Sequence, residues 1–452
     1  LTLATDPKDF RLVWKSEEIM PNGQGNATRR LPGVLMCRTI GGGASPVVSA
    51  DGKVYVNYIQ PSGTVSGIEN RYSKSANARV ELERLAAEWK TEVGPGTTEK
   101  FLLHADDVIV CMDAVTGKTL WKTVFAEKGR FQQGHKIGPV NNTPCVGDGK
   151  VFAMGSLGRV YALDAQTGKP LWEVPNITNV KLDLAKEGMG RFQGNSPVYV
   201  DGVVVTGNQG DTLYGFDAKT GAELWKLPGK NNAIAVPSRW THQGKNYIIS
   251  PADKIYCIDP KSGKVVWETE YKNGSKGVAV SGDILVGLTN CWVKMGKLEG
   301  KPLCVAWRMT PEKAERIWET PVNAHNELSA PAVNDKYVVV GNARPEPGEM
   351  QMLDLKTGKV LASVAGPAPI NEGHIFMAEN LVFCAPDGSH SHNTLAVYGG
   401  TPETFKLLSS WSAPHHHTNS YHCKCMTFPV VEGRLFMRGF DGIHCYDLRK
   451  KD

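Results

Sequence analysis

The sequence predicts an all-β protein, an eight-bladed β-propeller built from four-stranded antiparallel blades. Two observations predict it: a turn motif that recurs along the 452 residues, and an N-terminal strand that completes the last copy of the motif at the C-terminus. Self-similarity at a period of roughly 20 to 50 residues is the sequence signature of repeat architectures such as propellers. We therefore interpret residues 1–452 as one propeller domain.

In the repeated motif an Asp is followed eight residues later by a Trp, with a Gly between them. The copies read CMDAVTGKTLW, ALDAQTGKPLW, GFDAKTGAELW and CIDPKSGKVVW, and they place Trp residues at 121, 172, 225 and 267, between 42 and 53 residues apart. Apolar strand residues, a Thr-Gly or Ser-Gly turn and a second apolar strand form the pattern of a β-hairpin. Each copy therefore marks the outer hairpin of one blade.

Weaker copies complete the ring. MLDLKTGKVLA keeps the turn and loses the Trp, while Arg316-Ile317-Trp318 and Ser410-Trp411 keep the aromatic strand. The chain ends shortly after Asp447, where a Leu-Trp strand is expected, and the N-terminal Leu12-Val13-Trp14 supplies that strand. We therefore expect the first strand to join a blade made by the last three, closing a ring whose eight outer strands carry Trp14, Trp121, Trp172, Trp225, Trp267, Trp318, Leu361 and Trp411.

One segment interrupts the repeat. Between Trp14 and Trp121 the chain is long enough for one blade and an insertion, which we place at residues 61–100 within the first full blade. Asn77 is a candidate helix cap, and Leu82, Leu85, Ala86 and Trp89 follow at the spacing of one helical face. The insertion is predicted to be small and partly helical, either a flap over a site or a packing element.

The motif resembles the repeat of the pyrroloquinoline-quinone (PQQ)-like, or quinoprotein-type, β-propeller family over essentially the whole chain. The family includes quinone-dependent dehydrogenases and cofactor-free scaffold proteins, so the resemblance specifies the fold and leaves the chemistry open. It also implies a periplasmic or secreted location. The chain starts at Leu1, as expected if a signal peptide has been removed.

Composition argues against nucleic acid as a partner and against a transmembrane segment. The 51 basic and 46 acidic residues are scattered, give a net charge of +5 and form no basic run, so nucleic acid is not an expected partner. No stretch approaches the roughly 18 consecutive apolar residues of a transmembrane segment.

Histidines gather in the segments that a propeller places on one face. That face holds the connections into each innermost strand and between the two middle strands, and it receives nine of the twelve histidines. The other three, His104, His242 and His444, lie in strand patterns and are interpreted as structural. Because imidazole ligates transition metals and titrates near neutral pH, the sequence predicts a functional site at this mouth of the channel.

Three roles are assigned there. A divalent metal ion is expected, either zinc with a thiolate ligand or manganese or calcium with oxygen ligands. Its candidate ligands are His325, His374, His390, His392, His415, His416 and Asp387. Candidate catalytic residues are His417, Tyr421, His422 and His135. Two similar loops, GRFQQGH and GRFQGN, contribute the candidate substrate-binding residues Arg130, Arg191, Gln193 and Asn195. Asn326 is a further candidate.

Together these residues favour a metal-assisted carbohydrate-active enzyme, a polysaccharide lyase or a related sugar-eliminating or hydrolysing enzyme. An arginine or the metal would neutralise an acidic sugar, a histidine would abstract a proton, and Tyr421 or another histidine would protonate the leaving oxygen. The first alternative is a PQQ-dependent dehydrogenase, although the chain has no Cys-Cys dipeptide. The second is a non-catalytic propeller scaffold or binding protein.

Overall fold

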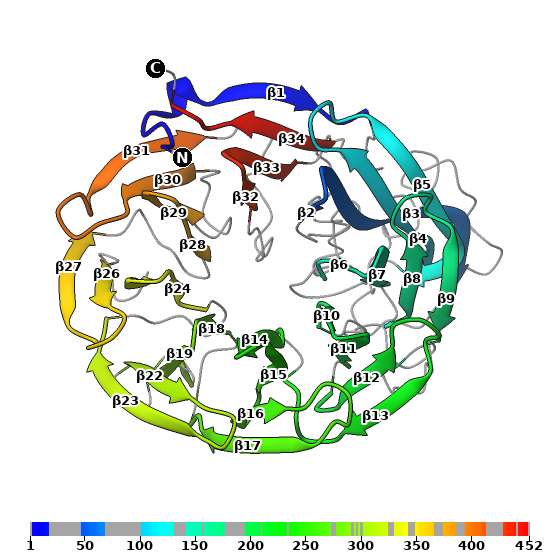
Figure 1. Ribbon diagram of the computed structural model, residues 1–452. Helices are drawn as coiled ribbons and strands as arrows, with labels where there is room; N and C mark the ends of the chain where they lie inside the picture. The colour runs from blue at the N-terminus through cyan, green and yellow to red at the C-terminus, as the bar shows by residue number, and fades with distance from the viewer. Residues whose placement is uncertain are drawn as a thin grey trace.

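The computed structural model is an eight-bladed β-propeller, as the sequence predicts (Figure 1). The structure describes residues 2–17, 47–67, 101–130, 142–155, 158–175, 177, 195–208, 210–232, 235–272, 277–290, 293–294, 297–298, 302–323, 330–341, 349–365, 374–385, 394–412, 428–439 and 442–450. The described residues contain one short 3₁₀ helix, η1 (Pro7–Asp9), and no helix long and apolar enough to cross a membrane.

The first four blades follow one another along the chain, each with its strands in sequence order from the channel outward. Blade 1 holds β2 (Val48–Ala50), β3 (Lys53–Gly67), β4 (Phe101–Asp113) and β5 (Thr119–Arg130), and blade 2 holds β6 (Cys145–Gly147), β7 (Lys150–Met154), β8 (Val160–Asp164) and β9 (Pro170–Val174). Blade 3 holds β10 (Val198–Val200), β11 (Val203–Gly207), β12 (Leu213–Asp217) and β13 (Glu223–Leu227), and blade 4 holds β14 (Ser238–His242), β15 (Lys245–Pro251), β16 (Lys254–Ile258) and β17 (Val265–Glu270).

The remaining blades continue the same order until the last. Blade 5 holds β18 (Val278–Ser281), β19 (Ile284–Thr289), β22 (Leu303–Met309) and β23 (Ala314–Pro321), with the two-stranded β20 (Val293–Lys294) and β21 (Lys297–Leu298) between its middle strands. Blade 6 holds β24 (Ala332–Val333), β25 (Tyr337–Gly341), β26 (Glu349–Asp354) and β27 (Val360–Ala365), and blade 7 holds β28 (His374–Ala378), β29 (Leu381–Ala385), β30 (Thr394–Gly399) and β31 (Leu407–Ser412). Blade 8 holds β32 (Val430–Val431), β33 (Arg434–Gly439), β34 (Gly442–Asp447) and, on its outer edge, β1 (Arg11–Lys15).

The predicted outer strands are confirmed in all eight blades. Each of the eight residues assigned to an outer strand lies on β1, β5, β9, β13, β17, β23, β27 or β31, and in Figure 1 these strands form the rim of the ring. The predicted closure is confirmed as well, because β1 pairs antiparallel with β34.

The Asp of the motif organises the turn between the two outer strands. In blade 1 the Asp113 carboxylate accepts hydrogen bonds from the Val115 amide (3.0 Å), the Thr116 amide (2.7 Å) and the Thr116 hydroxyl (2.8 Å). The hydroxyl contact is the main reason that the pKa of Asp113 lies below its ordinary value. Gly117 follows at φ +73°, a conformation that favours glycine.

The Trp of each motif fastens its blade to the next one. The indole N–H of Trp121 donates to the carbonyl oxygen of Ala165 in the turn of blade 2 (3.1 Å), and its ring covers Gly168, where an added Cβ would lie 2.5 Å from the ring. The same indole-to-carbonyl bond recurs at five more junctions: Trp14 to Ala114 (3.1 Å), Trp172 to Ala218 (3.1 Å), Trp225 to Pro260 (2.8 Å), Trp267 to Thr310 (2.9 Å) and Trp318 to Leu355 (2.9 Å).

Room for each Trp comes from a small residue on the neighbouring strand. The residues directly across from the six hydrogen-bonded Trp side chains are Cys445, Cys111, Ala162, Gly215, Cys257 and Ala306, in ring order from Trp14. In blade 6 the relation is reversed, because Ala362 replaces the Trp and lies opposite Met352. In each of these pairs one strand contributes the large side chain and the other the small one, so that the two together fill the space.

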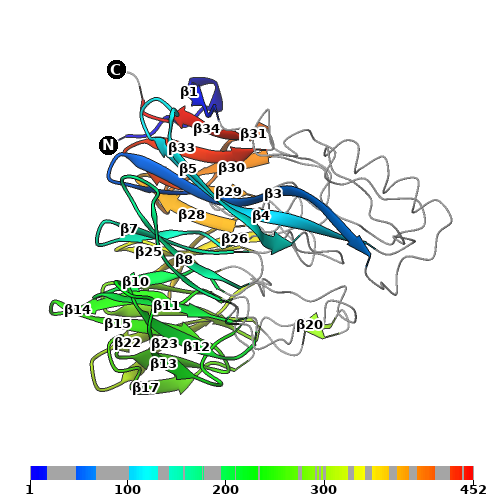
Figure 2. The same ribbon diagram turned by 90° about the vertical axis from the view of Figure 1, so that its right-hand side faces the viewer.

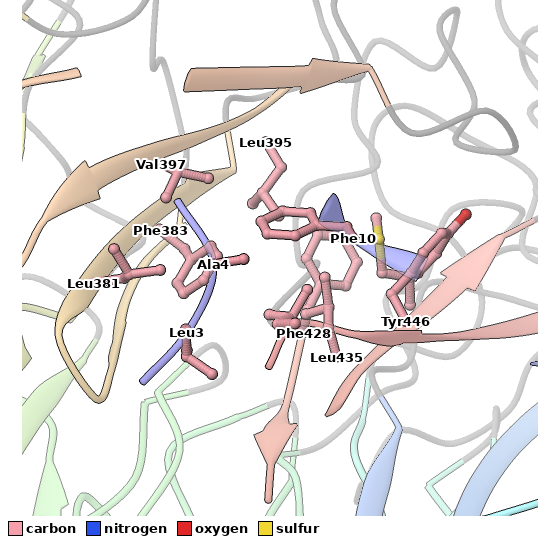
Figure 3. Packing of buried hydrophobic residues seen from close by; sticks show 12 residues of the cluster. Leu3, Ala4, Phe10, Leu381, Phe383, Leu395, Val397, Phe428, Leu435 and Tyr446 are labelled. Carbon is pink, nitrogen blue, oxygen red and sulfur yellow. The ribbon is translucent and has the colours of Figure 1, made fainter. Parts of the chain in front are cut away.

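The two chain ends meet in blade 8. Arg449 and Arg11 of β1 both bond the buried carboxylate of Asp447, at 2.8 Å and 2.6 Å, and the hydrogen bond from Arg449, followed by the charge of Arg11, holds its pKa down to about 2. Beneath them the N-terminal Leu3, Ala4 and Phe10 pack with residues of blades 7 and 8 in one apolar cluster (Figure 3). The ring is thus closed by a ladder, an ion-pair cluster and a core.

Blade 1 projects beyond its neighbours. Its strands β3, β4 and β5 are 15, 13 and 12 residues long, and in Figure 2 β3 and β4 extend past the ends of the other blades. Residues 61–67, which the sequence analysis placed in the insertion, are the last part of β3 and pair with the start of β4. The predicted helix, including Asn77, lies outside the described residues. We call the face on which blade 1 projects the loop face and the opposite one the hairpin face.

Replacing Trp121 by Phe should lower the free energy of unfolding by about 1–2 kcal/mol more than replacing Trp411 by Phe. Both changes shrink an outer-strand aromatic side chain, but no hydrogen bond from the Trp411 indole is present among the described residues, whereas the Trp121 indole bonds Ala165. Urea unfolding of the two variants measures the difference. Equal losses would show that the indole bond contributes no net stability.

Replacing Asp447 by Asn should destabilise the protein at pH 7 by about 1–2 kcal/mol, less than the full shift implies because both arginines are about half exposed. The folded-state pKa is depressed, so this stabilisation is present above the unfolded pKa of about 4 and is lost as pH falls toward 2. Denaturant titrations at pH 7 and pH 3.5 should show the gap between variant and wild type narrowing at the lower pH. A constant gap would contradict the assignment.

Candidate functional site at the loop face

Three of the predicted site residues lie within the described part of the chain, and all three are at the loop face. Arg130 is the last residue of β5, His374 is the first residue of β28, and Asn195 precedes β10. The others lie outside the described residues and remain predictions: His135, Arg191, Gln193, His325, Asn326, Asp387, His390, His392, His415, His416, His417, Tyr421 and His422.

Asn195 ties the entrance of blade 3 to the entrance of blade 4. Its side chain is 3% exposed, and Nδ2 donates to Asn231 Oδ1 (2.7 Å) and to the carbonyl oxygens of Asn232 (3.2 Å) and Ala235. Its own carbonyl oxygen accepts a hydrogen bond from the Thr206 hydroxyl (2.7 Å). Oδ1, in contrast, has no partner among the described residues. The amide nitrogen is therefore structural, and only Oδ1 is left for the predicted role in substrate binding.

Asn231 extends this network into blade 3. Its Nδ2 donates to the carbonyl oxygens of Asn208 (2.9 Å) and Gly210 (3.2 Å), and Asn208 Nδ2 approaches the carbonyl oxygen of Ile177 (3.4 Å). A Cβ at Gly207 would lie 2.1 Å from Asn231 Oδ1, so glycine is required there. The amides thus satisfy the backbone groups of segments that have no strand partner.

A second bond joins the entrances of blades 2 and 3. The Thr143 amide donates to the Ser196 hydroxyl (2.9 Å). The two residues occupy matching places in Asn142–Pro144 and Asn195–Pro197, each an Asn, a hydroxyl residue and a Pro before an inner strand. The repeated Asn, hydroxyl residue and Pro are therefore a sequence signal for the polar contacts between blade entrances, and the predictions from sequence missed it.

Between blades 1 and 2 a buried carboxylate meets a buried phenol. The Tyr161 hydroxyl donates to Asp107 Oδ2 (2.8 Å), and the Tyr161 ring stacks on Phe125 with a centroid separation of 4.0 Å. Burial, and then the charge of Asp107, raise the pKa of Tyr161 far above its ordinary value. A Cβ at Gly155 would lie 2.1 Å from Asp107 Oδ2. Tyr161 stays protonated and serves as a hydrogen-bond donor to the carboxylate.

Arg438 joins three blades at the same level. Its side chain is 7% exposed, and Nη1 donates to the carbonyl oxygen of Asn57 (3.3 Å), while Asn57 Nδ2 donates to the carbonyl oxygen of Met154 (3.0 Å). Blades 8, 1 and 2 are therefore linked in sequence. Nothing in the local strand pattern RLFMRG distinguishes this Arg from an exposed one.

The described part of the loop face is thus a rigid polar frame. It contains five buried asparagines, Asn57, Asn142, Asn195, Asn208 and Asn231, one buried arginine and the Asp107–Tyr161 pair. Such groups hold the inner ends of the blades in place and can orient a polar ligand through amide and guanidinium donors.

Comparison with known proteins places this ring in a family. The family model PQQ_2, described as "Outer membrane protein assembly factor BamB", matches residues 3–237 and 236–384. The chain belongs to this family. The resemblance inferred from the Asp-to-Trp motif is therefore confirmed, and the match covers blades 1 to 6 and the start of blade 7.

Two groups are represented among the relatives of this PQQ-like propeller. It is 27% identical over 275 residues to the dehydrogenase subunit of a quinone alcohol dehydrogenase of Gluconacetobacter polyoxogenes, covering 56% of this chain and 36% of the relative. It is 23% identical over 358 residues to the outer membrane protein assembly factor BamB of Burkholderia pseudomallei, covering 72% of this chain and 81% of the relative. The PQQ-like propeller thus spans about a third of the alcohol dehydrogenase that it matches.

Solved structures support the fold alone. BamB from Moraxella catarrhalis superposes with a TM-score of 0.53 at 12% identity, covering 77% of this chain and 92% of that one. The Sqt1 protein of Saccharomyces cerevisiae gives 0.52 at 8% identity over the same share of this chain and 93% of its own.

These comparisons correct the predicted function. The relatives are quinone-dependent dehydrogenases and BamB proteins, so the assignment as a polysaccharide lyase or other carbohydrate-active enzyme is wrong. Histidine and arginine at a channel mouth were interpreted as lyase chemistry, but these residue types also suit other ligands. The predicted zinc, manganese or calcium ion is unsupported, since no group of three His, Cys, Asp or Glu side chains within the described residues could hold a metal.

Replacing Asn195 by Ala should lower the free energy of unfolding by about 1–3 kcal/mol, because the carbonyl oxygens of Asn232 and Ala235 at the entrance of blade 4 would lose a buried donor. Asn246 provides a control: its amide donates to Asp201 (2.7 Å) and accepts from Thr241 (2.6 Å) at a partly exposed position where water can replace both bonds, so Asn246→Ala should cost less than about 0.5 kcal/mol. Chemical denaturation compares the two. Equal, small effects would show that the network does not brace the mouth.

Proposed function

We propose that this chain is an extracytoplasmic quinoprotein-type propeller that binds pyrroloquinoline quinone at the loop face and oxidises a small-molecule alcohol. The observation that carries the proposal is the similarity to quinone alcohol dehydrogenases, which extends over 56% of the chain. Quinohemoprotein alcohol dehydrogenase ADH-IIG of Pseudomonas putida matches over a similar share, 57%. Both groups of relatives favour a location outside the cytoplasm.

The described residues form the polar frame of the loop face, but they do not by themselves make a binding site for PQQ. PQQ is a planar tricarboxylate, which favours arginine and amide donors. Arg438 and the buried asparagines have this chemistry, but their described contacts are with protein groups. We therefore draw no chemical step through the quinone, which when bound would accept the electrons removed from the alcohol.

The predicted catalytic histidines would act as proton acceptors for the alcohol. Imidazole has an ordinary pKa near 6.5, so His417, His422 or His135 could accept the hydroxyl proton of an alcohol at neutral pH. Arg130 and Arg191 would pair with carboxylates of the quinone or substrate. These roles rest on the sequence pattern and on the position of Arg130 at the loop-face end of β5.

The test is equilibrium dialysis of the purified chain against PQQ with calcium or magnesium, read by absorbance, followed by a dye-coupled alcohol dehydrogenase assay. We expect one PQQ per chain, with at least 10-fold weaker binding or activity in His417→Ala or His422→Ala. His242→Ala is the control, because His242 bonds Asp283 (2.9 Å) at the hairpin face. Absence of PQQ binding at about 100 μM with either ion would refute the proposal.

A second candidate is a non-catalytic scaffold that binds proteins, as the name of the BamB relatives suggests. The observation that favours it is coverage, since 81% of Burkholderia BamB aligns with this chain and only 36% of the alcohol dehydrogenase subunit does. Failure to bind PQQ, together with capture of an outer-membrane assembly protein by cross-linking in cells, would establish this role instead.

A further inference from the structure

Seven of the eight junctions between neighbouring blades contain a hydrogen bond across the junction among the described residues. Six of them have the indole bond described above. The junction between blades 7 and 8 lacks it, but the N-terminal segment of blade 8 bridges the gap: the Leu3 amide donates to Asn380 Oδ1 (3.3 Å), and the Ser409 hydroxyl donates to the Thr5 carbonyl oxygen (2.6 Å).

The junction between blades 6 and 7 is different. Ala362 stands where the Trp would be, and no hydrogen bond or ion pair joins residues 330–365 to residues 374–412 in the described structure. The contact consists of one apolar cluster, with Ala332, Val339, Met350 and Met352 from blade 6 and Val382, Cys384, Ala396, Tyr398 and Phe405 from blade 7. Within the described residues, this junction is therefore held by burial of apolar surface.

A second observation concerns the same junction. The Tyr398 side chain is fully buried in this cluster, and its hydroxyl has no hydrogen-bond partner among the described residues. The junction between blades 1 and 2 also contains a buried tyrosine, Tyr55, but its hydroxyl reaches the Ala165 carbonyl oxygen (3.4 Å). A buried hydroxyl without a partner destabilises the closed state, because water would bond it if the junction opened.

We propose that the junction between blades 6 and 7 is the native hinge of the propeller, the place where the ring opens first. Local opening occurs where the fewest interactions must break, and among the described residues only apolar contacts separate here while a polar group gains water. Strands β29 and β30 of blade 7 precede and follow residues 386–393 in the chain. The strand ends that move in this opening are therefore the ones adjoining, in sequence, the predicted site residues Asp387, His390 and His392.

The buried cysteines of the protein report on this opening without any mutation. Five thiols are buried at five different junctions: Cys111 between blades 1 and 2, Cys257 between 4 and 5, Cys304 between 5 and 6, Cys384 between 6 and 7, and Cys445 between 8 and 1. Burial raises the thiol pKa of Cys111 and Cys384 to about 11 and about 12. Such thiols react with alkylating reagents mainly when their junction opens.

The experiment is native-state alkylation of the full chain, with each thiol followed by peptide mass spectrometry and its rate divided by the rate of the same thiol in denaturant. We expect Cys384 to react at least 10-fold faster than each of the other four. A rate for Cys384 equal to or below theirs would overturn the proposal, and so would equal rates for all five, which indicate global unfolding.

A conservative variant separates the role of the hydroxyl from that of the apolar packing. Tyr398→Phe removes the unpartnered hydroxyl and keeps the ring, so it should slow the alkylation of Cys384 about fivefold and leave Cys111 unchanged. Tyr55→Phe is the matched control, because it removes a bonded hydroxyl and should accelerate Cys111 without affecting Cys384. Faster alkylation of Cys384 in Tyr398→Phe would contradict the inference.

Discussion

The hydrogen bond from a Trp indole to the turn of the following blade is the interaction on which the rest of the ring depends. At five of the six junctions it occurs together with three other features: an Asp that folds the turn, a Gly that leaves room for the indole, and a small residue across from the Trp, as with Asp164, Gly168 and Cys111 around Trp121. Because the motif serves two blades, neither outer hairpin reaches its full stability alone. The repeated spacing in the sequence thus records contacts between blades.

The fold could be predicted from the sequence because the turn motif that makes this interaction is local in the chain and repeated. The motif determined the number of blades and the eight outer strands, and the unfinished copy after Asp447 identified Trp14 as its partner. The Met352–Ala362 pair shows why the copy without a Trp still forms a blade. The turn is kept, and the large side chain lies on the other strand of the pair. The extent of β3 was missed because Pro61 and Gly63 in the sequence indicate a loop.

The site was less predictable because its frame consists of contacts between segments far apart in the chain. Asn57 and Arg438 are 381 residues apart, and Asn195 with Asn231 depends on how two blade entrances meet. Residue type alone identified a histidine-rich face, but it could not distinguish sugar chemistry from quinone chemistry, since arginine, histidine and tyrosine serve both. That distinction came from the relatives, whose names point to quinones or to protein assembly.

Because β1 and β34 close the ring, the order in which the blades fold decides when the ring can close. The partner of β1 is β34, which lies more than 400 residues further along the chain, so the two strands can pair only when the blades between them bring the ends together. Until then Leu12, Val13 and Trp14 form an apolar strand without a sheet, while the blades between can already fold in order against one another. A chain that folds blade by blade is therefore an open arc with an unpaired apolar strand at one end, and the ring becomes cooperative only when β1 and β34 pair.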